Sequence, residues 1–188
     1  MKIIKRLISV VLVIALVFGC ALIAAFKLYP VKYAEAIDEY SKAYGVDKYL
    51  ILSIIKAESN FDNGAVSHKK ASGLMQITKG TADWLSEMLE INGFNYERDI
   101  RNPELNIKMG SFYISYLKDL YDESLDCALA SYNAGPNNVN KWLLNKEYSK
   151  DGKTLDKIPF PETERYINKV KTNYKIYKLL YKEAVDEK

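Results

Sequence analysis

Residues 49–59, YLILSIIKAES, form an apolar stretch that closes with Glu58 and Ser59, and residues 67–76, SHKKASGLMQ, follow shortly after. The first stretch predicts a buried helix, and the second is rich in small residues that let the backbone approach a ligand closely. Apolar surroundings disfavour the charged form of a carboxyl group. A carboxylic acid that keeps its proton near neutral pH can donate it to a glycosidic oxygen. Glu58 is therefore a candidate general acid, and a glutamate that only makes a local hydrogen bond is the competing interpretation.

A second feature is the uncharged run of residues 7–26, which follows Lys2, Lys5 and Arg6. At about 1.5 Å per residue, 20 apolar residues span the roughly 30 Å hydrocarbon core of a membrane. The run predicts a membrane anchor. A cleaved signal peptide and a lipoprotein processed at Cys20 are the alternatives. The run is longer than the apolar region of an ordinary signal peptide and continues six residues beyond Cys20.

The charge distribution separates this segment from the rest of the chain. Its three basic residues account for the whole formal net charge of +3, so residues 27–188 are formally neutral. A neutral domain gives no basis for electrostatic capture of nucleic acid. We expect a single-pass anchor at residues 1–26, with its basic end in the cytoplasm. Residues 27–188 are then expected to form one globular domain outside the cytoplasm, at the cell membrane.

Cysteine and histidine usage argues against several chemistries. His68 is the only histidine and has no cysteine pair near it in the sequence, so the zinc-ligand spacing is missing. Cys20 lies in the uncharged run and Cys127 in an apolar helical segment, so no disulfide is expected within the domain. Cys127 is predicted to be a small buried side chain and not a nucleophile. We expect neither a metal nor a cofactor.

The remaining sequence is dominated by apolar residues at helical spacing, and no stretch alternates as a strand would. Asp47 is a predicted N-cap, and Asn102 followed by Pro103 is a strong helix start. The predicted fold class is therefore all-α. The expected helices cover residues 31–44, 48–58, 81–91, 103–121, 125–132, 137–144 and 161–181, and residues 146–157 are expected to form an exposed loop.

Four blocks of this sequence resemble, in order and spacing, the catalytic domain of the soluble-lytic-transglycosylase (SLT) family, of the glycoside hydrolase family 23 type. The resemblance covers residues 31–181 and implies a lysozyme-like helical domain, which the uncharged run of residues 7–26 precedes as one N-terminal transmembrane helix. The sequence has Thr78-Lys79 where the family often has Met-Pro, and Glu164 where it often has arginine. The blocks are Glu58-Ser59 with Phe61-Asp62 and Ala65-Val66-Ser67, then ASGLMQI at 71–77 with Thr81-Ala82, ALASYNAGP at 128–136, and Pro161-Glu162-Thr163 with Tyr166, Lys169 and Val170.

The resemblance implies a membrane-anchored peptidoglycan lytic transglycosylase that serves cell-wall remodelling. In such an enzyme Glu58 is the only catalytic carboxylate. It protonates the β-1,4 oxygen between N-acetylmuramic acid and N-acetylglucosamine, then acts as base on the muramic acid 6-hydroxyl, which closes a 1,6-anhydro ring. The expected partners are peptidoglycan glycan strands and the membrane, and tethering suggests cell-wall or secretion machinery as a further partner.

The same blocks supply the expected substrate-binding residues. Met75 is expected to pack on a sugar face and Gln76 to meet polar substituents, and the tyrosine at the end of the third block is expected beside Glu58. For each of these residues a purely structural role is the alternative. The full set is Ser67, Gly73, Met75, Gln76, Tyr132, Asn133, Glu162 and Tyr166.

Two other functions remain open at this point. A lysozyme-type muramidase hydrolyses the same bond, and hydrolysing glycosidases usually need a second carboxylate about 5–9.5 Å from the first. Asp62, Asp83 and Asp99 are the candidates for that role, although Asp62 is expected to cap a turn. A non-catalytic wall-binding scaffold is the second alternative, but a scaffold has no need of the acid.

Overall fold

The computed structural model describes residues 2–181. The chain divides into two units between Val31 and Lys32, and each unit is described here by itself. The first unit contains one long helix, α1 (Lys2–Leu28). The segment Arg6–Leu28 is long and apolar enough to cross a membrane, and none of its most apolar window is buried by protein. The helix thus runs two residues past Phe26, where the anchor was predicted to end.

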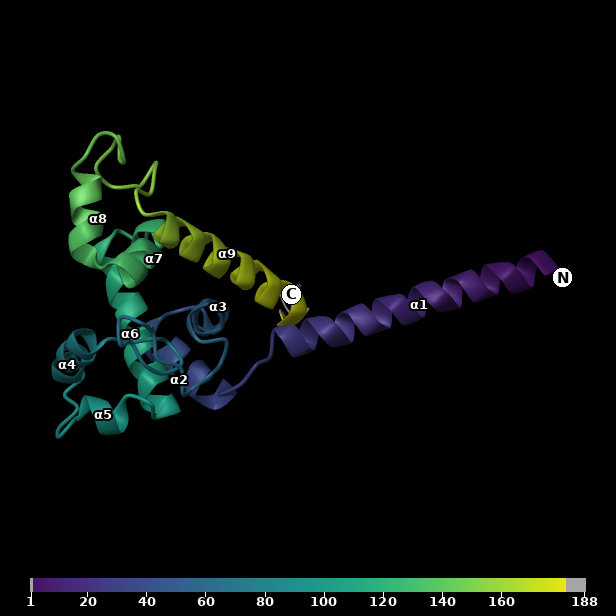
Figure 1. The fold of residues 1–188 in the computed structure, drawn as a ribbon, viewed down its shortest axis with the longest axis horizontal. Coiled ribbons are helices and arrows are strands. Elements are labelled where there is room, and N and C mark those ends of the chain that lie inside the picture. The colour runs from purple at the N-terminus through teal and green to yellow at the C-terminus, as the bar shows by residue number, and fades with distance from the viewer. Residues whose placement is uncertain (1, 182–188) are drawn as a thin grey trace. The chain divides into compact units, whose positions relative to one another are not determined.

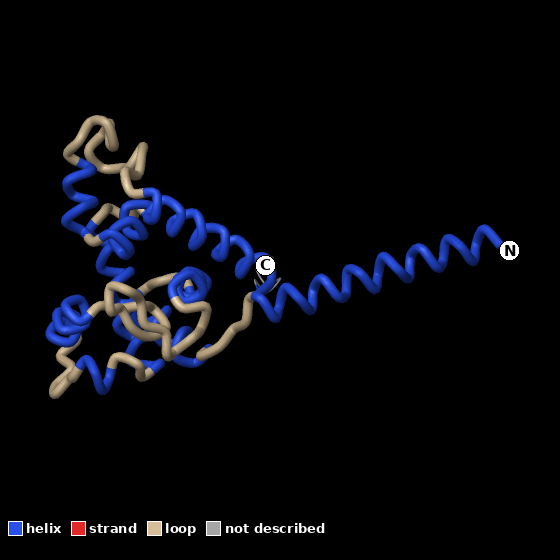
Figure 2. The backbone as a smooth tube through the Cα atoms, in the orientation of Figure 1, coloured by secondary structure: helices blue, strands red, loops and turns tan. Residues whose placement is uncertain are grey.

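The second unit is helical, and Figure 2 shows blue helices joined by tan loops. Between residues 32 and 181 the only β-type pairings are isolated bridges that join Ser72 to Val66 and to Ile77. The all-α prediction is therefore confirmed for the described residues. The helices of this unit are α2 (Ala34–Tyr44), α3 (Lys48–Glu58), α4 (Lys79–Met88), α5 (Tyr96–Asp99), α6 (Pro103–Leu120), α7 (Leu125–Ala134), α8 (Pro136–Leu143) and α9 (Pro161–Tyr181).

Two long helices, α6 and α9, organise this unit (Figure 1). Helix α9 packs against α3 and α7, and α6 packs against α7, α2 and α4. Helix α3 is buried on nearly all sides, because residues 50–55 are all buried. Helix α8 contacts the residue that precedes α9, since the Trp142 ring on α8 packs edge-on against the Phe160 ring with 4.9 Å between the ring centroids. The apolar stretch that ends at Glu58 therefore lies in the centre of the domain.

Most helix ends follow the predicted capping residues. The Asp47 side chain accepts a hydrogen bond from the backbone N–H of Tyr49, and Asn102 caps α6 ahead of Pro103. Helix α2 begins at Ala34 and not at residue 31, because Tyr33 has a left-handed backbone conformation with φ 59°. Helix α4 begins two residues earlier than predicted, because Thr78 caps it through the N–H of Thr81.

Candidate active site

Glu58 is the last residue of α3, and Ser59 follows it at the helix end. The hydroxyl of Ser59 donates a hydrogen bond of 2.8 Å to the carbonyl of Leu74, so the end of α3 is tied to the loop that follows. The chain then turns sharply through Asn60 and Phe61, which both have positive φ, and the Phe61 ring is buried. This turn directs the chain from the acid towards the 71–77 loop.

The loop is held in place by Asn106, a fully buried residue of α6. Its Oδ1 accepts a 2.7 Å hydrogen bond from the N–H of Met75, and its Nδ2 donates to the carbonyls of Ser72 (3.1 Å) and Ile100 (2.9 Å). A buried amide with all three of these partners is satisfied, and without it the N–H of Met75 and the carbonyl of Ile100 would be buried unpaired. Sequence analysis missed this residue, although a polar side chain on the apolar stripe of α6 was a signal for it.

Two glycines make room for this loop against α6. Gly73 has φ +84°, and a Cβ atom there would lie 2.8 Å from Cγ of Asn106. On α6, a Cβ atom at Gly110 would lie 2.8 Å from Cβ of Met75. Both distances are below those of real contacts, so a side chain at either position displaces the loop from the helix. The SGLM sequence is therefore seated on α6 by close packing.

Glu58 lines a pocket of about 360 Å³. Five of the eight predicted substrate-binding residues line it too, although they come from the loop, from α7 and from α9. Sequence analysis did not assign His68, Lys69, Ala71 and Thr78 to the site, yet all four belong to its wall. The predicted residues that line the pocket are Ser67, Gln76, Tyr132, Asn133 and Glu162.

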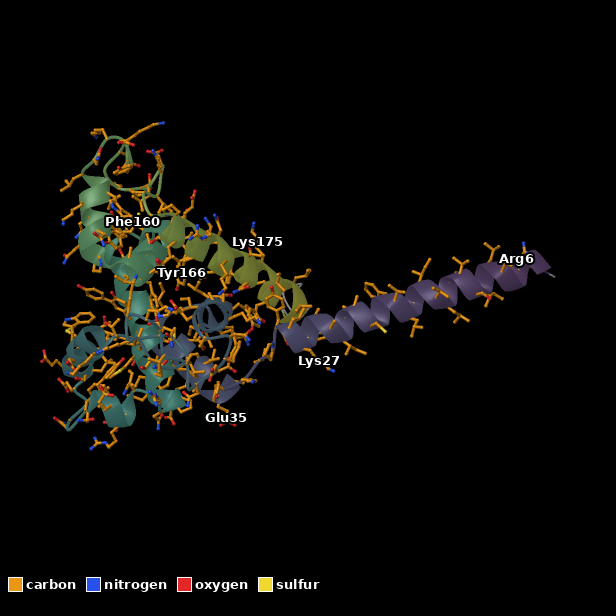
Figure 3. The ribbon with its side chains drawn as sticks, viewed as in Figure 1. Arg6, Lys27, Glu35, Phe160, Tyr166 and Lys175 are labelled. Atoms are coloured by element: carbon orange, nitrogen blue, oxygen red, sulfur yellow. The ribbon has the colours of Figure 1, made fainter. Side chains whose placement is uncertain are left out.

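The other three predicted residues lie behind the pocket wall. The Met75 side chain is fully buried beside Gly110, so it does not present a face to a sugar as expected. Gly73 is packed against Asn106 and does not line the pocket. Tyr166 is buried on α9 (Figure 3), where it acts on Glu58 from behind. Met75 and Gly73 therefore pack the loop against α6 and do not line the pocket.

Two tyrosines surround the acid and differ in their hydrogen bonding. The hydroxyl of Tyr132 donates a 2.9 Å hydrogen bond to the carbonyl of Met75, so its proton is already used. The hydroxyl of Tyr166 is buried without a hydrogen bond of standard geometry, but it is close enough to Glu58 to lower the pKa of that carboxyl group. Burial raises the pKa of both tyrosines well above 10, so both keep their protons. Tyr166 therefore has a free O–H group for the charged form of Glu58.

The pKa of Glu58 is raised from 4.5 to about 7, chiefly because burial removes the carboxyl group from water. The Tyr166 hydroxyl and the positive charge of Lys169 lower this pKa, while the negative charge of Glu162 adds to the rise. A carboxyl group with such a pKa is present in both protonation states near neutral pH. It can therefore donate a proton in one step and accept one in the next.

Lys169, on α9, was quoted in the sequence blocks but was not predicted to act at the site. Its Nζ donates a 2.6 Å hydrogen bond to the carbonyl of Ala57, the residue before Glu58. This bond satisfies a carbonyl at the C-terminal end of α3 and places a positive charge near the acid. Helix α9 also contacts α7 here, because Thr163 donates a 2.8 Å hydrogen bond to Oδ1 of Asn133.

None of the aspartates considered as a second carboxylate lines the pocket. Asp62 accepts a hydrogen bond from the N–H of Gly64, a turn role as expected. Asp83 pairs with Lys79, and Asp99 pairs with Arg98. Within the described part of the chain, Glu162 is the one carboxyl group besides Glu58 in the pocket wall. Its side chain is exposed at the start of α9, so the two acids differ in their surroundings.

A larger hollow of about 600 Å³ lies where α2 and α6 begin, and Glu35, Glu39 and Glu104 line it. These glutamates are exposed, and no residue of the four sequence blocks is among those lining the hollow. The smaller pocket at Glu58 is therefore the better candidate for the active site, because it contains the buried acid with a raised pKa. In the described residues, no three His, Cys, Asp or Glu side chains group closely enough to hold a metal ion.

Comparisons with known proteins identify relatives. Residues 35–155 match the family described as "Transglycosylase SLT domain". The chain is 32% identical over 143 residues to the soluble lytic murein transglycosylase of Escherichia coli K12, covering 76% of this chain and 22% of that protein. It is 30% identical over 167 residues to membrane-bound lytic murein transglycosylase C of Photorhabdus laumondii, covering 78% of this chain and 46% of that protein.

Solved structures agree with these matches. The crystal structure of the 70 kDa soluble lytic transglycosylase from E. coli superposes with a TM-score of 0.73 at 28% identity, over 82% of this chain and 25% of that one. The lytic transglycosylase Slt of Pseudomonas aeruginosa, solved as an inactive glutamate-to-glutamine mutant, gives a TM-score of 0.70 at 28% identity, over 80% and 24% of the two chains. The chain thus spans about a quarter or less of these proteins.

Proposed function

Because this chain belongs to the transglycosylase SLT domain family, we propose that it is a peptidoglycan lytic transglycosylase. It cleaves the β-1,4 bond between N-acetylmuramic acid and N-acetylglucosamine and leaves a 1,6-anhydro-muramic acid end. One observation carries the proposal. The carboxyl group of Glu58 has a pKa of about 7 and lies in the wall of a pocket. The names of the relatives from E. coli and Photorhabdus, both lytic murein transglycosylases, support the same reaction.

The reaction needs one group that gives a proton and then takes one. Protonated Glu58 donates its proton to the glycosidic oxygen, and the bond from that oxygen to the anomeric carbon breaks with its electron pair on the oxygen. The Glu58 carboxylate then takes the proton of the 6-hydroxyl, whose oxygen bonds to the anomeric carbon. Glu58 ends in its starting state, and no water is consumed.

The surroundings of Glu58 suit both steps. Burial favours the protonated acid that begins the cycle, while Tyr166 and Lys169 favour the carboxylate that forms in the middle of it. Tyr166 has its O–H group free for that carboxylate, whereas the O–H of Tyr132 is bound to Met75. The two tyrosines therefore have separate tasks: Tyr132 joins α7 to the loop, and Tyr166 stabilises the charged acid.

The wall of the pocket offers polar groups for the sugars. The Gln76 amide nitrogen donates to the carbonyls of Ala65 (3.0 Å) and Gly73 (2.8 Å), so its oxygen is the group left for substrate. The Asn133 oxygen accepts from Thr163, so its amide nitrogen is left as a donor. We propose that Gln76, Asn133 and Ser67 bind substrate, and that Glu162 lines the groove from α9.

The products decide between this reaction and hydrolysis. We expect mass analysis of fragments released from purified peptidoglycan to show 1,6-anhydro-muramic acid ends, which are 18 mass units lighter than reducing ends by the loss of one water. A muramidase, with Glu162 activating a water, would instead give mainly reducing ends. A scaffold without catalytic activity would release no fragments from the wall.

We further propose that α1 anchors the enzyme in the cell membrane as a single span with the domain outside the cytoplasm. Its apolar segment Arg6–Leu28 fits the hydrocarbon core, and the basic residues at its start favour the cytoplasmic side. The name of the Photorhabdus relative, a membrane-bound enzyme, supports membrane association. Association with cell-wall or secretion machinery stays a prediction.

The anchor predicts that the mature protein extracted from membranes keeps its first residues. Mass analysis of the intact chain is expected to find residues 1–26 attached, and carbonate washing is expected to leave the protein in the membrane fraction. A mature chain that begins at an acylated Cys20 would identify a lipoprotein. A chain that begins near Lys27 would identify a cleaved signal peptide, and either result contradicts the span but leaves the catalytic proposal intact.

A further inference from the structure

The pocket wall includes a tight turn at residues 67–70 that carries three consecutive basic side chains. The N–H of Lys70 donates to the carbonyl of Ser67 (2.9 Å), and the Ser67 hydroxyl accepts from the N–H of Ala71 (3.1 Å). The Tyr96 hydroxyl donates a 2.8 Å hydrogen bond to the carbonyl of Lys70, which ties the turn to α5. The turn is therefore fixed by its backbone, and its side chains are left exposed.

Two of these side chains, His68 and Lys69, belong to residues that line the pocket of Glu58. In the described structure neither makes an ion pair or a side-chain hydrogen bond. Some lysines elsewhere in the domain pair with carboxylates, as Lys171 does with Asp126 and Lys79 with Asp83. A cationic side chain that has no protein partner and faces a substrate pocket is free to pair with an anion there.

The backbone at this turn also departs from the usual preference. Lys70 has φ 58°, a left-handed conformation that favours glycine and costs other residues energy. Strained residues of this kind concentrate at functional sites, where the surrounding structure holds them in place. The turn thus keeps a second lysine charge, beside that of Lys69, at a position where glycine would be less strained.

We propose that the Ser67–Lys70 turn binds a carboxylate of the substrate, with Lys69 as the main contact. The inference rests on the proposed function for its substrate class. Peptidoglycan strands have carboxylates in their stem peptides, and where the peptide has been removed the lactyl group of muramic acid has one. The turn therefore distinguishes these strands from chitin-type chains, which have the same backbone linkage and no carboxylate.

The simpler interpretation is that Lys69 is solvated and contributes only to solubility. Binding measurements on the full-length protein in detergent micelles separate the two interpretations, with Glu58→Gln as the background so that no probe is cleaved. The probes are tetrasaccharides of two N-acetylglucosamine–N-acetylmuramic acid units with free-carboxylate stem peptides, with amidated stem peptides, or with no peptides. Chitotetraose is the probe without a carboxylate.

We expect Lys69→Gln to weaken binding of the free-carboxylate probe by about fivefold to tenfold, which lies between the effect of an exposed ion pair and that of a desolvated charge-assisted hydrogen bond. Lys69→Arg should retain most of the affinity, and the effect of Lys69→Gln should shrink as salt is added. Chitotetraose should bind equally to both proteins. The peptide-free and amidated probes show whether the lactyl group or the stem supplies the carboxylate.

Lys175→Gln is the matched control, because Lys175 is exposed on α9 (Figure 3). At 3.6 residues per turn it lies on the opposite face from Tyr166. The proposal is overturned if Lys69→Gln and Lys175→Gln have equal effects, or if Lys69→Gln weakens chitotetraose as much as the free-carboxylate probe. Failure of the proposed function gives a different result: the wild-type chain would leave no anhydro ends, whatever the binding of the probes.

Discussion

Glu58→Gln is expected to lower the rate of peptidoglycan cleavage by about 10²–10⁴-fold, the usual contribution of a positioned general acid and base. The amide has nearly the same shape as the acid but has no acidic proton to give and no carboxylate to form. The measurement is the release of anhydro-muropeptides from purified walls by full-length wild-type and variant protein. Activity within a few-fold of wild type would refute the assignment of Glu58.

The same variant reports on the pKa of Glu58 through stability. The carboxyl group has a pKa of about 7 in the folded domain and 4.5 as the reference value for the unfolded chain. Between these pH values the unfolded chain releases a proton that the folded domain keeps, so the free energy of unfolding of wild type should fall as the pH rises from 4.5 to 7. We expect a fall of about 3 kcal/mol. Glu58→Gln should lack this fall, and a cooperative unfolding transition in the same measurement shows that the variant is folded.

Asn106→Ala is expected to lower the free energy of unfolding by about 3–5 kcal/mol, because it leaves two buried backbone groups unpaired and opens a cavity. Those groups are the N–H of Met75 and the carbonyl of Ile100, whereas the carbonyl of Ser72 keeps its hydrogen bond from the N–H of Ile77. A loss of this size should lower the Tm by about 10 °C or more for a domain of this length. Thermal unfolding followed by circular dichroism provides the measurement.

Asn137→Ala is the control, since Asn137 is exposed at the start of α8. It should change the free energy of unfolding by no more than about 0.5 kcal/mol. Activity gives a second measurement, because the loop held by Asn106 also receives the hydrogen bonds of Ser59 and Tyr132. An Asn106→Ala variant with unchanged Tm would show that the loop does not depend on this residue.

The helices could be predicted largely from local signals. The Asp47 and Asn102 caps and the apolar stripes depend on residues a few positions apart, and the structure places α3, α6 and α9 where the sequence indicated. The one-turn helix α5 was missed, because four residues are too few to show a period. The spacing of apolar residues therefore predicts helices well when the helices are several turns long.

The candidate site was predicted less completely, because its contacts join residues far apart in the chain. Glu58 was identified from its apolar helix, but nothing in the sequence placed Lys169 on the carbonyl of Ala57. Met75 was expected in the groove, and its burial follows from Gly110, a residue 35 positions away. Sequence motifs name the residues that meet, whereas packing decides which of them face the ligand.

The close packing of the 71–77 loop against α6 has a consequence for engineering. Asn106 and Gly110 lie four positions apart on one face of α6, and together they receive Gly73 and Met75. These four positions form one module, so a loop grafted onto another helical scaffold has to bring its two helix partners with it. The exposed His68 and Lys69 lie outside the module. Redesign of the domain for a different polymer can therefore vary the turn while these four positions stay unchanged.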